Sequence, residues 1–188
     1  MKFITIQLKW VATMTVTAFL IMTSVPVFAG GTHGTTGGTH GVVQGTGTAG
    51  KAKDVTRTIE ITMNDNYYEP EVINVKEDET VRFVIKNTGL LVHEFNLGTQ
   101  AMHTAHQQEM LMMVQHGALL PDRIDQHKML MDMGNGNVMK HDDPNSILLE
   151  PGISGEVIWK FAKTNEIEFA CNVPGHYQAG MVGEIKVN

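Results

Sequence analysis

The stretch CNVPGHYQAGM, residues 171–181, contains the only cysteine of the chain, a histidine five positions later and a methionine five positions after that. A Pro-Gly pair forces a tight turn between Cys171 and His176, and a glycine just before Met181 relaxes the chain. One short loop can therefore present a thiol, an imidazole and a thioether to a single point. Such soft ligands select copper, above all in its reduced state, whereas a thioether is a poor ligand for zinc.

A second imidazole is needed to complete a copper site, and the best candidate is His93 in GLLVHEFNL, residues 89–97. It follows an Asn-Thr-Gly turn and lies in an apolar strand, where a polar ring without a partner would cost free energy. Two histidines and one cysteine in a trigonal arrangement, with a long axial methionine, define a blue-copper site. We therefore predict one type 1 copper centre, cycling between Cu(I) and Cu(II), with the ligands His93, Cys171, His176 and Met181.

Apolar and polar residues alternate with a period of two in several segments on either side of this loop. This alternation indicates half-buried antiparallel strands, and turn residues separate the segments. Short strands joined by regular turns favour an all-β sandwich. The alternating apolar positions are Ile59, Ile61 and Met63; Val81, Phe83 and Ile85; Val157, Trp159 and Phe161; and Ile167, Phe169 and Cys171, with a last strand at 182–187.

Two segments of the chain resemble a known family. CNVPGHYQAGMVGEIKV, residues 171–187, resembles the ligand loop and final strand of cupredoxins, the family of plastocyanin, azurin and rusticyanin, and its Cys-x4-His-x4-Met spacing is closest to the rusticyanin type. NYYEPEVINVKEDETVRFVIKNTGLLVHEFNLG, residues 66–98, resembles the first half of the domain. The resemblance covers about residues 55–98 and 147–188. It implies a Greek-key β-sandwich or barrel that binds one copper through His93, Cys171, His176 and Met181.

The chain departs from the family pattern at two places. Many cupredoxins have Asn or Ser directly after the upstream histidine, which ties the two ligand loops together, whereas this chain has Glu94. Differences around the ligands shift the redox potential and colour of a copper site, so neither property can be transferred. The second departure is an insertion, residues 99–146, which makes the chain look more like the periplasmic cupredoxins associated with bacterial copper tolerance.

The insertion is rich in methionine and histidine and holds eight of the 13 methionines. Met102, His106, Met110 and Met113 fall on one face of a helix, which we expect to end near His116-Gly117. Two interpretations stay open: methionine at helical spacing usually fills a core, but so many soft donors could also bind further Cu(I). The candidates for extra metal binding are Met110, Met112, Met113, Met129, Met131, Met133, His103 and His106.

The N-terminal residues 1–29 have the pattern of a secretory signal peptide, with Lys2 and Lys9 before an apolar run and Ala29 at the cleavage position. The weaker alternative is a retained transmembrane helix. Residues 30–54, rich in Gly and Thr, are predicted to form a flexible tether, followed by a cupredoxin domain at 55–188. His33 and His40 could bind metal weakly, although a solvated linker fits the composition better. The expected location is the periplasm.

Removal of the signal peptide takes away two lysines and no acidic residue, so the formal net charge of −6 becomes −8. Nucleic acid is therefore excluded as a partner on grounds of charge. With one cysteine no disulfide can form within the chain, and a free thiol in an oxidising compartment tends to be oxidised unless something occupies it.

The sequence suggests three candidate functions for the chain. The first is a periplasmic copper-binding protein that sequesters or relays copper in copper tolerance, with copper ions and a periplasmic or membrane copper-handling or redox protein as partners. The second is a soluble one-electron carrier with a single type 1 centre. The third, a copper enzyme, is disfavoured because multicopper oxidases build additional centres from His-x-His pairs, and this sequence contains none. The insertion favours the first function, because many exchangeable soft ligands suit copper storage better than electron transfer.

Overall fold

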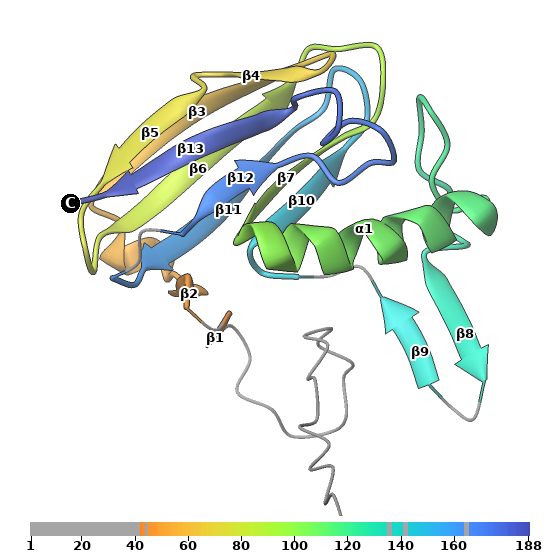
Figure 1. Ribbon diagram of the computed structural model, residues 1–188, viewed down its shortest axis with the longest axis horizontal. Helices are drawn as coiled ribbons and strands as arrows, with labels where there is room; N and C mark the ends of the chain where they lie inside the picture. Colours follow the sequence, from red (N-terminus) through yellow and green to blue (C-terminus); the bar gives the residue numbers. More distant parts are fainter. Residues whose placement is uncertain (1–41, 44, 135–136, 141–142, 164–165) are drawn as a thin grey trace, which may run out of the picture.

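The computed structural model describes residues 42–43, 45–134, 137–140, 143–163 and 166–188, and two packed β-sheets form the body of the protein (Figure 1). One sheet has the strand order β1-β2-β11-β6-β3-β4, and the other has the order β10-β7-β12-β13-β5. Neighbouring strands are mostly not consecutive in the chain, and the pairs β3/β6 and β5/β13 are parallel. The predicted all-β sandwich is confirmed.

The strands have the following bounds. The first sheet contains β1 (Val42–Val43), β2 (Gly47–Ala49), β11 (Ser154–Phe161), β6 (Thr80–Asn87), β3 (Arg57–Asn64) and β4 (Tyr67–Glu69). The second contains β10 (Ser146–Leu149), β7 (His93–Gly98), β12 (Glu168–Ala170), β13 (Val182–Val187) and β5 (Val72–Val75). A separate hairpin consists of β8 (Leu130–Gly134) and β9 (Asn137–Lys140), and η1 (Ala52–Asp54) is a short 3-10 turn.

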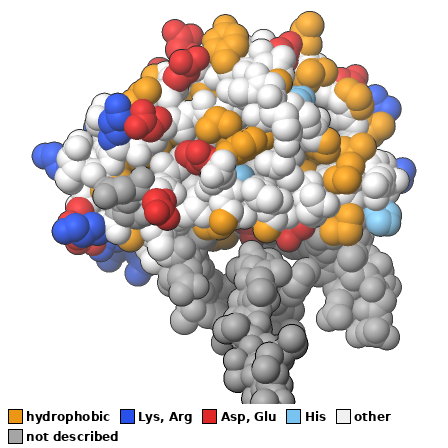
Figure 2. All heavy atoms as spheres, in the orientation of Figure 1, with side chains coloured by type: hydrophobic (Ala, Val, Ile, Leu, Met, Phe, Trp, Pro, Cys, Tyr) orange, Lys and Arg blue, Asp and Glu red, His pale blue; other side chains and the backbone are white. Residues whose placement is uncertain are grey.

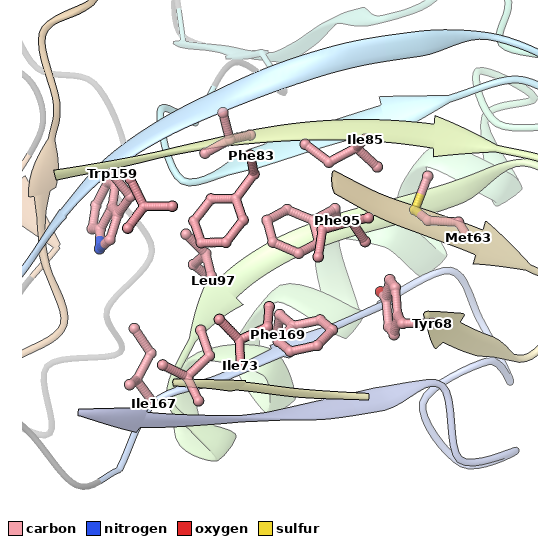
Figure 3. Packing of buried hydrophobic residues seen from close by; sticks show 14 of the residues in the cluster. Met63, Tyr68, Ile73, Phe83, Ile85, Phe95, Leu97, Trp159, Ile167 and Phe169 are labelled. Carbon is pink, nitrogen blue, oxygen red and sulfur yellow. The ribbon is translucent and has the colours of Figure 1, made fainter. Parts of the chain in front are cut away.

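The core lies between the two sheets and is built around aromatic rings. Phe95 of β7 packs against Phe83 of β6 and Phe169 of β12, with ring centroids 5.3 and 5.4 Å apart, and Tyr68 lies 4.9 Å from Phe169 (Figure 3). Residues alternate between buried and exposed on β3, β6 and β11, as predicted, and the inward-facing side chains of these strands belong to the same cluster. The core reaches Cys171 and Met181, which are both fully buried at its end.

The insertion between β7 and β10 begins with one helix, α1 (Gln100–Gln115), which runs alongside the sandwich (Figure 1). Its N-cap is Thr99, whose side chain accepts a hydrogen bond from the Met102 N–H, and Gly117 follows its end with φ of 68°. The predicted end of the helix is confirmed. The β8–β9 hairpin, which projects away from the sandwich, was not predicted, because its sequence lacks the alternation of a strand.

A second apolar cluster fastens this insertion to the sandwich. Its buried members come from α1, from the segment after the helix and from the residue just before β7. They are Val92, Met110, Met113, Ala118 and Leu119, and Met129 and Leu148 pack against them. The predicted helix face was therefore correct, and two of its methionines serve as packing residues.

The predicted boundary between tether and domain at residues 54 and 55 needs correction, because β2 already belongs to the first sheet. Ala49 pairs with Trp159 and Gly47 with Phe161, and the Thr46 carbonyl accepts a hydrogen bond of 3.3 Å from the Trp159 indole. The glycine-rich composition suggested a flexible linker, but Gly47 meets a packing need: a Cβ there would collide with the Lys160 carbonyl. The proposed signal peptide and residues 30–41 lie outside the described residues.

Among the described residues no helix is both long enough and apolar enough to cross a membrane. The one α-helix there, α1, has 16 residues.

We predict that a chain starting at residue 55 is less stable than a chain starting at residue 45 by about 2–4 kcal/mol, because it loses the β2 ladder and uncovers Trp159. Urea denaturation followed by tryptophan fluorescence checks this, since the only other tryptophan, Trp10, is absent from both chains. Equal free energies of unfolding would show that residues 45–54 are a tether after all.

Candidate metal centre

Two imidazole nitrogens and one thiol sulfur meet at the end of the sandwich core. The Cys171 Sγ lies 3.3 Å from the His176 Nδ1 and 3.9 Å from the His93 Nδ1, and the two Nδ1 atoms are 3.1 Å apart. His93 and Cys171 are fully buried, whereas His176 is partly exposed. The structure thus brings together three of the four residues that the sequence predicted as ligands.

The loop after β12 presents two of these groups because its backbone is folded by its own hydrogen bonds. The His176 N–H donates to the Val173 carbonyl at 2.9 Å, which closes the predicted Pro-Gly turn, and Gly175 has a φ of 93°. The Met181 N–H donates to the His176 carbonyl at 3.0 Å, and the Cys171 N–H donates to the Met181 carbonyl at 3.1 Å. Met181 is fully buried where this loop closes.

The spacing of the three donor atoms fits a bound metal ion. Nitrogen and sulfur ligands about 2.0–2.3 Å from a metal in a trigonal plane lie about 3.5–4 Å from one another. The observed separations of 3.1, 3.3 and 3.9 Å need to change by only a few tenths of an ångström to meet this requirement. One soft thiolate and two borderline imidazoles form a donor set that suits copper.

Asp65 orients the buried histidine of the centre. Its Oδ1 lies 2.9 Å from the His93 Nε2, so this nitrogen carries the proton and the lone pair of Nδ1 points at the other two donors. The same carboxylate accepts hydrogen bonds from the Leu90 and Leu91 N–H groups. The sequence predicted only a turn between strands at Asp65, because the contact of Asp65 with His93 spans 28 positions.

Burial keeps the donor atoms uncharged when no metal is bound. It raises the pKa of the Cys171 thiol to about 12, so a metal must displace the proton in order to bind the thiolate. Burial and the neighbouring His93 lower the pKa of His176 to about 4. Burial also lowers the pKa of His93, although the hydrogen bond to Asp65 opposes this shift.

Glu94, which the sequence marked as a departure from the family, does tie the two ligand segments together. Its backbone N–H donates to the Cys171 Sγ at 3.3 Å, and its carboxylate accepts from the N–H and the side-chain amide of Asn172 at 3.2 and 2.8 Å. The carboxylate also accepts from the Ser146 hydroxyl at 2.6 Å and lies 2.9 Å from the His106 Nε2. A fully buried carboxylate here replaces the neutral Asn or Ser of many cupredoxins.

The candidate metal ligands of the insertion differ in their burial and contacts. Met110 and Met113 are buried packing residues, and Met112 and Met129 are half-buried. His103 is buried beside Asn172, and both ring nitrogens of His106 face carboxylates, which disfavours a paired His103/His106 metal site. The side chains of Met131 and Met133, and residues His33, His40 and His141, lie outside the described part of the structure.

Comparison with known proteins agrees with this geometry. Residues 39–104 match the family model of the Cupredoxin-like domain. The chain is 51% identical over 150 residues to the copper-resistant cuproprotein CopI of Pseudomonas aeruginosa, covering 77% of this chain and 83% of that protein. The chain belongs to the CopI family of cupredoxins. The CopI of Rubrivivax gelatinosus is 40% identical over 142 residues, which cover 75% of this chain and 72% of the relative.

Solved structures support the fold of this CopI-family chain. Auracyanin B superposes with a TM-score of 0.54 at 18% sequence identity, over 76% of this chain and 96% of auracyanin B. At this identity the likeness concerns the fold alone. The loop at residues 171–181 and the segment before His93 predicted a cupredoxin related to copper-resistance proteins. This prediction is confirmed.

We predict that the metal-free protein loses stability as the pH is lowered from about 6.5 to about 4. The unfolded chain binds a proton at His176 near pH 6.5, but the folded protein resists protonation until about pH 4, so unfolding takes up a proton in this window. The stabilisation is complete above pH 6.5 and is lost as the pH falls. Urea denaturation at a series of pH values measures the slope.

The variant His176→Gln should flatten this slope, and the exposed His127→Gln should not. Some slope remains in His176→Gln because the lowered pKa of His93 acts in the same direction. An unchanged slope in His176→Gln would contradict the electrostatic description of the centre.

Proposed function

We propose that this protein binds copper through His93, Cys171 and His176, with Met181 as the axial ligand, and that it acts in copper resistance. The convergence of two Nδ1 atoms and one Sγ within 3.9 Å is the observation that carries the proposal. The names of the relatives, copper-resistant cuproproteins, support the same role for this chain. They also favour binding over catalysis.

Bound copper would supply one-electron exchange between Cu(I) and Cu(II) and a strong bond to the Cys171 thiolate. Two groups of the protein orient the donor atoms for copper. The Asp65 carboxylate accepts the His93 Nε2 proton, which leaves Nδ1 unprotonated, and the Glu94 N–H donates a hydrogen bond to the Cys171 sulfur. The core closes over Cys171 and Met181 and excludes water from them. Only His176 gives the centre access to solvent among these four residues.

The resistance role consists of sequestering copper or relaying it to a partner in the periplasm. Residues 1–29 would direct export as a signal peptide, and residues 30–41, which precede β1, would act as a tether. Further Cu(I) would bind the insertion, where Met110 and Met113 are buried by packing and the remaining candidates are Met112, Met129, Met131 and Met133. Their thioethers are soft ligands that exchange readily.

A one-electron carrier is the second candidate, and the partial exposure of His176 favours it, because a redox partner could approach this ring. Apolar surface is available for such an approach: Leu90, close to the centre in the chain, is 78% exposed, and Leu111 and Val114 of α1 are exposed as well. Figure 2 shows hydrophobic side chains gathered on the half of the molecule where α1 lies. A copper-relay partner would use the same access.

Copper stoichiometry separates the two candidates. We expect the full chain to bind more than one Cu(I) under reducing conditions, and the variant with Met112, Met129, Met131 and Met133 changed to Leu to bind fewer. Leucine keeps the apolar volume but removes the sulfur. The visible spectrum of the Cu(II)-loaded centre should be the same in both proteins.

The matched control changes the buried Met110 and Met113 to Leu, which should leave the stoichiometry unchanged because these side chains serve packing. If the wild-type chain itself binds a single copper, the storage role of the insertion is wrong and the electron-carrier function should replace it.

A further inference from the structure

A buried ion pair connects the insertion helix to the proposed copper centre. The Glu94 side chain is 0% exposed and the His106 side chain 10% exposed, and the Glu94 Oε1 lies 2.9 Å from the His106 Nε2. The other ring nitrogen, Nδ1, lies 3.0 Å from the Glu109 Oε2. Glu94 directly follows a ligand in β7, whereas His106 and Glu109 belong to α1.

The geometry shows that His106 carries a positive charge. A neutral imidazole has one N–H group, but here both ring nitrogens are within 3.0 Å of carboxylate oxygens, which only accept hydrogen bonds. Burial lowers the pKa of His106, but Glu94 and Glu109 overcome this effect and raise it to about 10. The imidazolium therefore compensates the buried charge of Glu94, which would otherwise be costly.

The compensated carboxylate acts directly on the segment that carries the thiol. It binds the Asn172 backbone and side chain, one residue after Cys171, while the Glu94 N–H donates to the Cys171 sulfur. Hydrogen bonds to a cysteine sulfur, and the orientation of the residues around it, determine the properties of a copper–thiolate centre. A displaced Glu94 would release both ligand segments at once.

We propose that His106 is a positioning residue of the copper centre: from the insertion helix, through Glu94, it holds Cys171 and His93 in their relative geometry. This inference rests on the proposed function and adds a second role for the insertion, which sets the geometry of the centre in addition to storing copper. Helix α1 is held separately by Met110 and Met113, so the contribution of His106 is distinct from the docking of the helix.

A double-mutant cycle on the full chain tests the proposal with His106→Gln, Glu94→Gln and the double variant. The first readout needs no copper: amide hydrogen exchange of residues 171–181 in the metal-free protein. The second is the rate at which EDTA removes Cu(II) from protein loaded with one equivalent, together with the position of the thiolate absorption band. Gln108→Ala, an exposed change on α1, is the neutral control, and Met113→Ala loosens the packing of the helix without touching the ion pair.

Each single variant should speed amide exchange in residues 171–181, raise the rate of copper loss about 10- to 100-fold and shift the absorption band, because it breaks the buried ion pair between Glu94 and His106. The combined effect in the double variant should be smaller than the product of the two single effects, since both charges of the Glu94–His106 pair are removed together. Met113→Ala should leave the band in place.

Three results would overturn the proposal: unchanged exchange and copper loss in His106→Gln, independent effects of the two substitutions, or the same changes in Met113→Ala. A wild-type chain that does not bind copper would instead refute the proposed function, while the amide exchange data would still decide whether His106 holds the loop.

Discussion

Three donor atoms, the Nδ1 atoms of His93 and His176 and the Sγ of Cys171, lie within 3.9 Å of one another at the end of the buried core. Such an arrangement does not form in a flexible chain, because the ordering entropy and the loss of hydration oppose it. Two segments 78 positions apart must therefore be fixed by the rest of the protein. Most of the unusual features of this chain serve that requirement.

The sandwich and the insertion share this task. The sandwich supplies β7 and β12 as adjacent strands and a rigid aromatic core whose end encloses Cys171. Asp65 orients His93 from the turn between β3 and β4, and Glu94 joins the two ligand segments. The insertion covers this end of the molecule with α1 and supplies the positive charge that allows a carboxylate to be buried there. The insertion, for which the sequence left packing and Cu(I) binding both open, is thus part of the scaffold.

The sequence predicted the sandwich well, because the alternation within each strand is a short-range pattern. Period-two alternation identified β3, β6 and β11. Three of the four candidate copper ligands lie in the loop at residues 171–181, where their spacing can be seen directly in the sequence. The contacts of Asp65 and the pairing of Glu94 with His106 could not be predicted, since they join residues that only the tertiary fold brings together.

The predicted start of the domain at residue 55 was wrong for a related reason. A Gly/Thr-rich segment has the composition of a linker, and only the close approach of Gly47 to Lys160 explains why glycine is needed in a strand. The β8–β9 hairpin was missed because its sequence is too short and too rich in methionine to show a clear strand pattern. The axial role of Met181 stays a prediction that its burial at the closure of the loop supports.

The visible absorption of the copper-loaded protein shows whether the lone thiol is a copper ligand. The full chain is loaded with one equivalent of Cu(II), and its visible absorption is compared with that of the variant Cys171→Ser. We expect an intense thiolate-to-copper charge-transfer band in the wild-type protein and no such band in the variant. A wild-type spectrum without this band, or a band that survives in Cys171→Ser, would contradict the assignment of the centre.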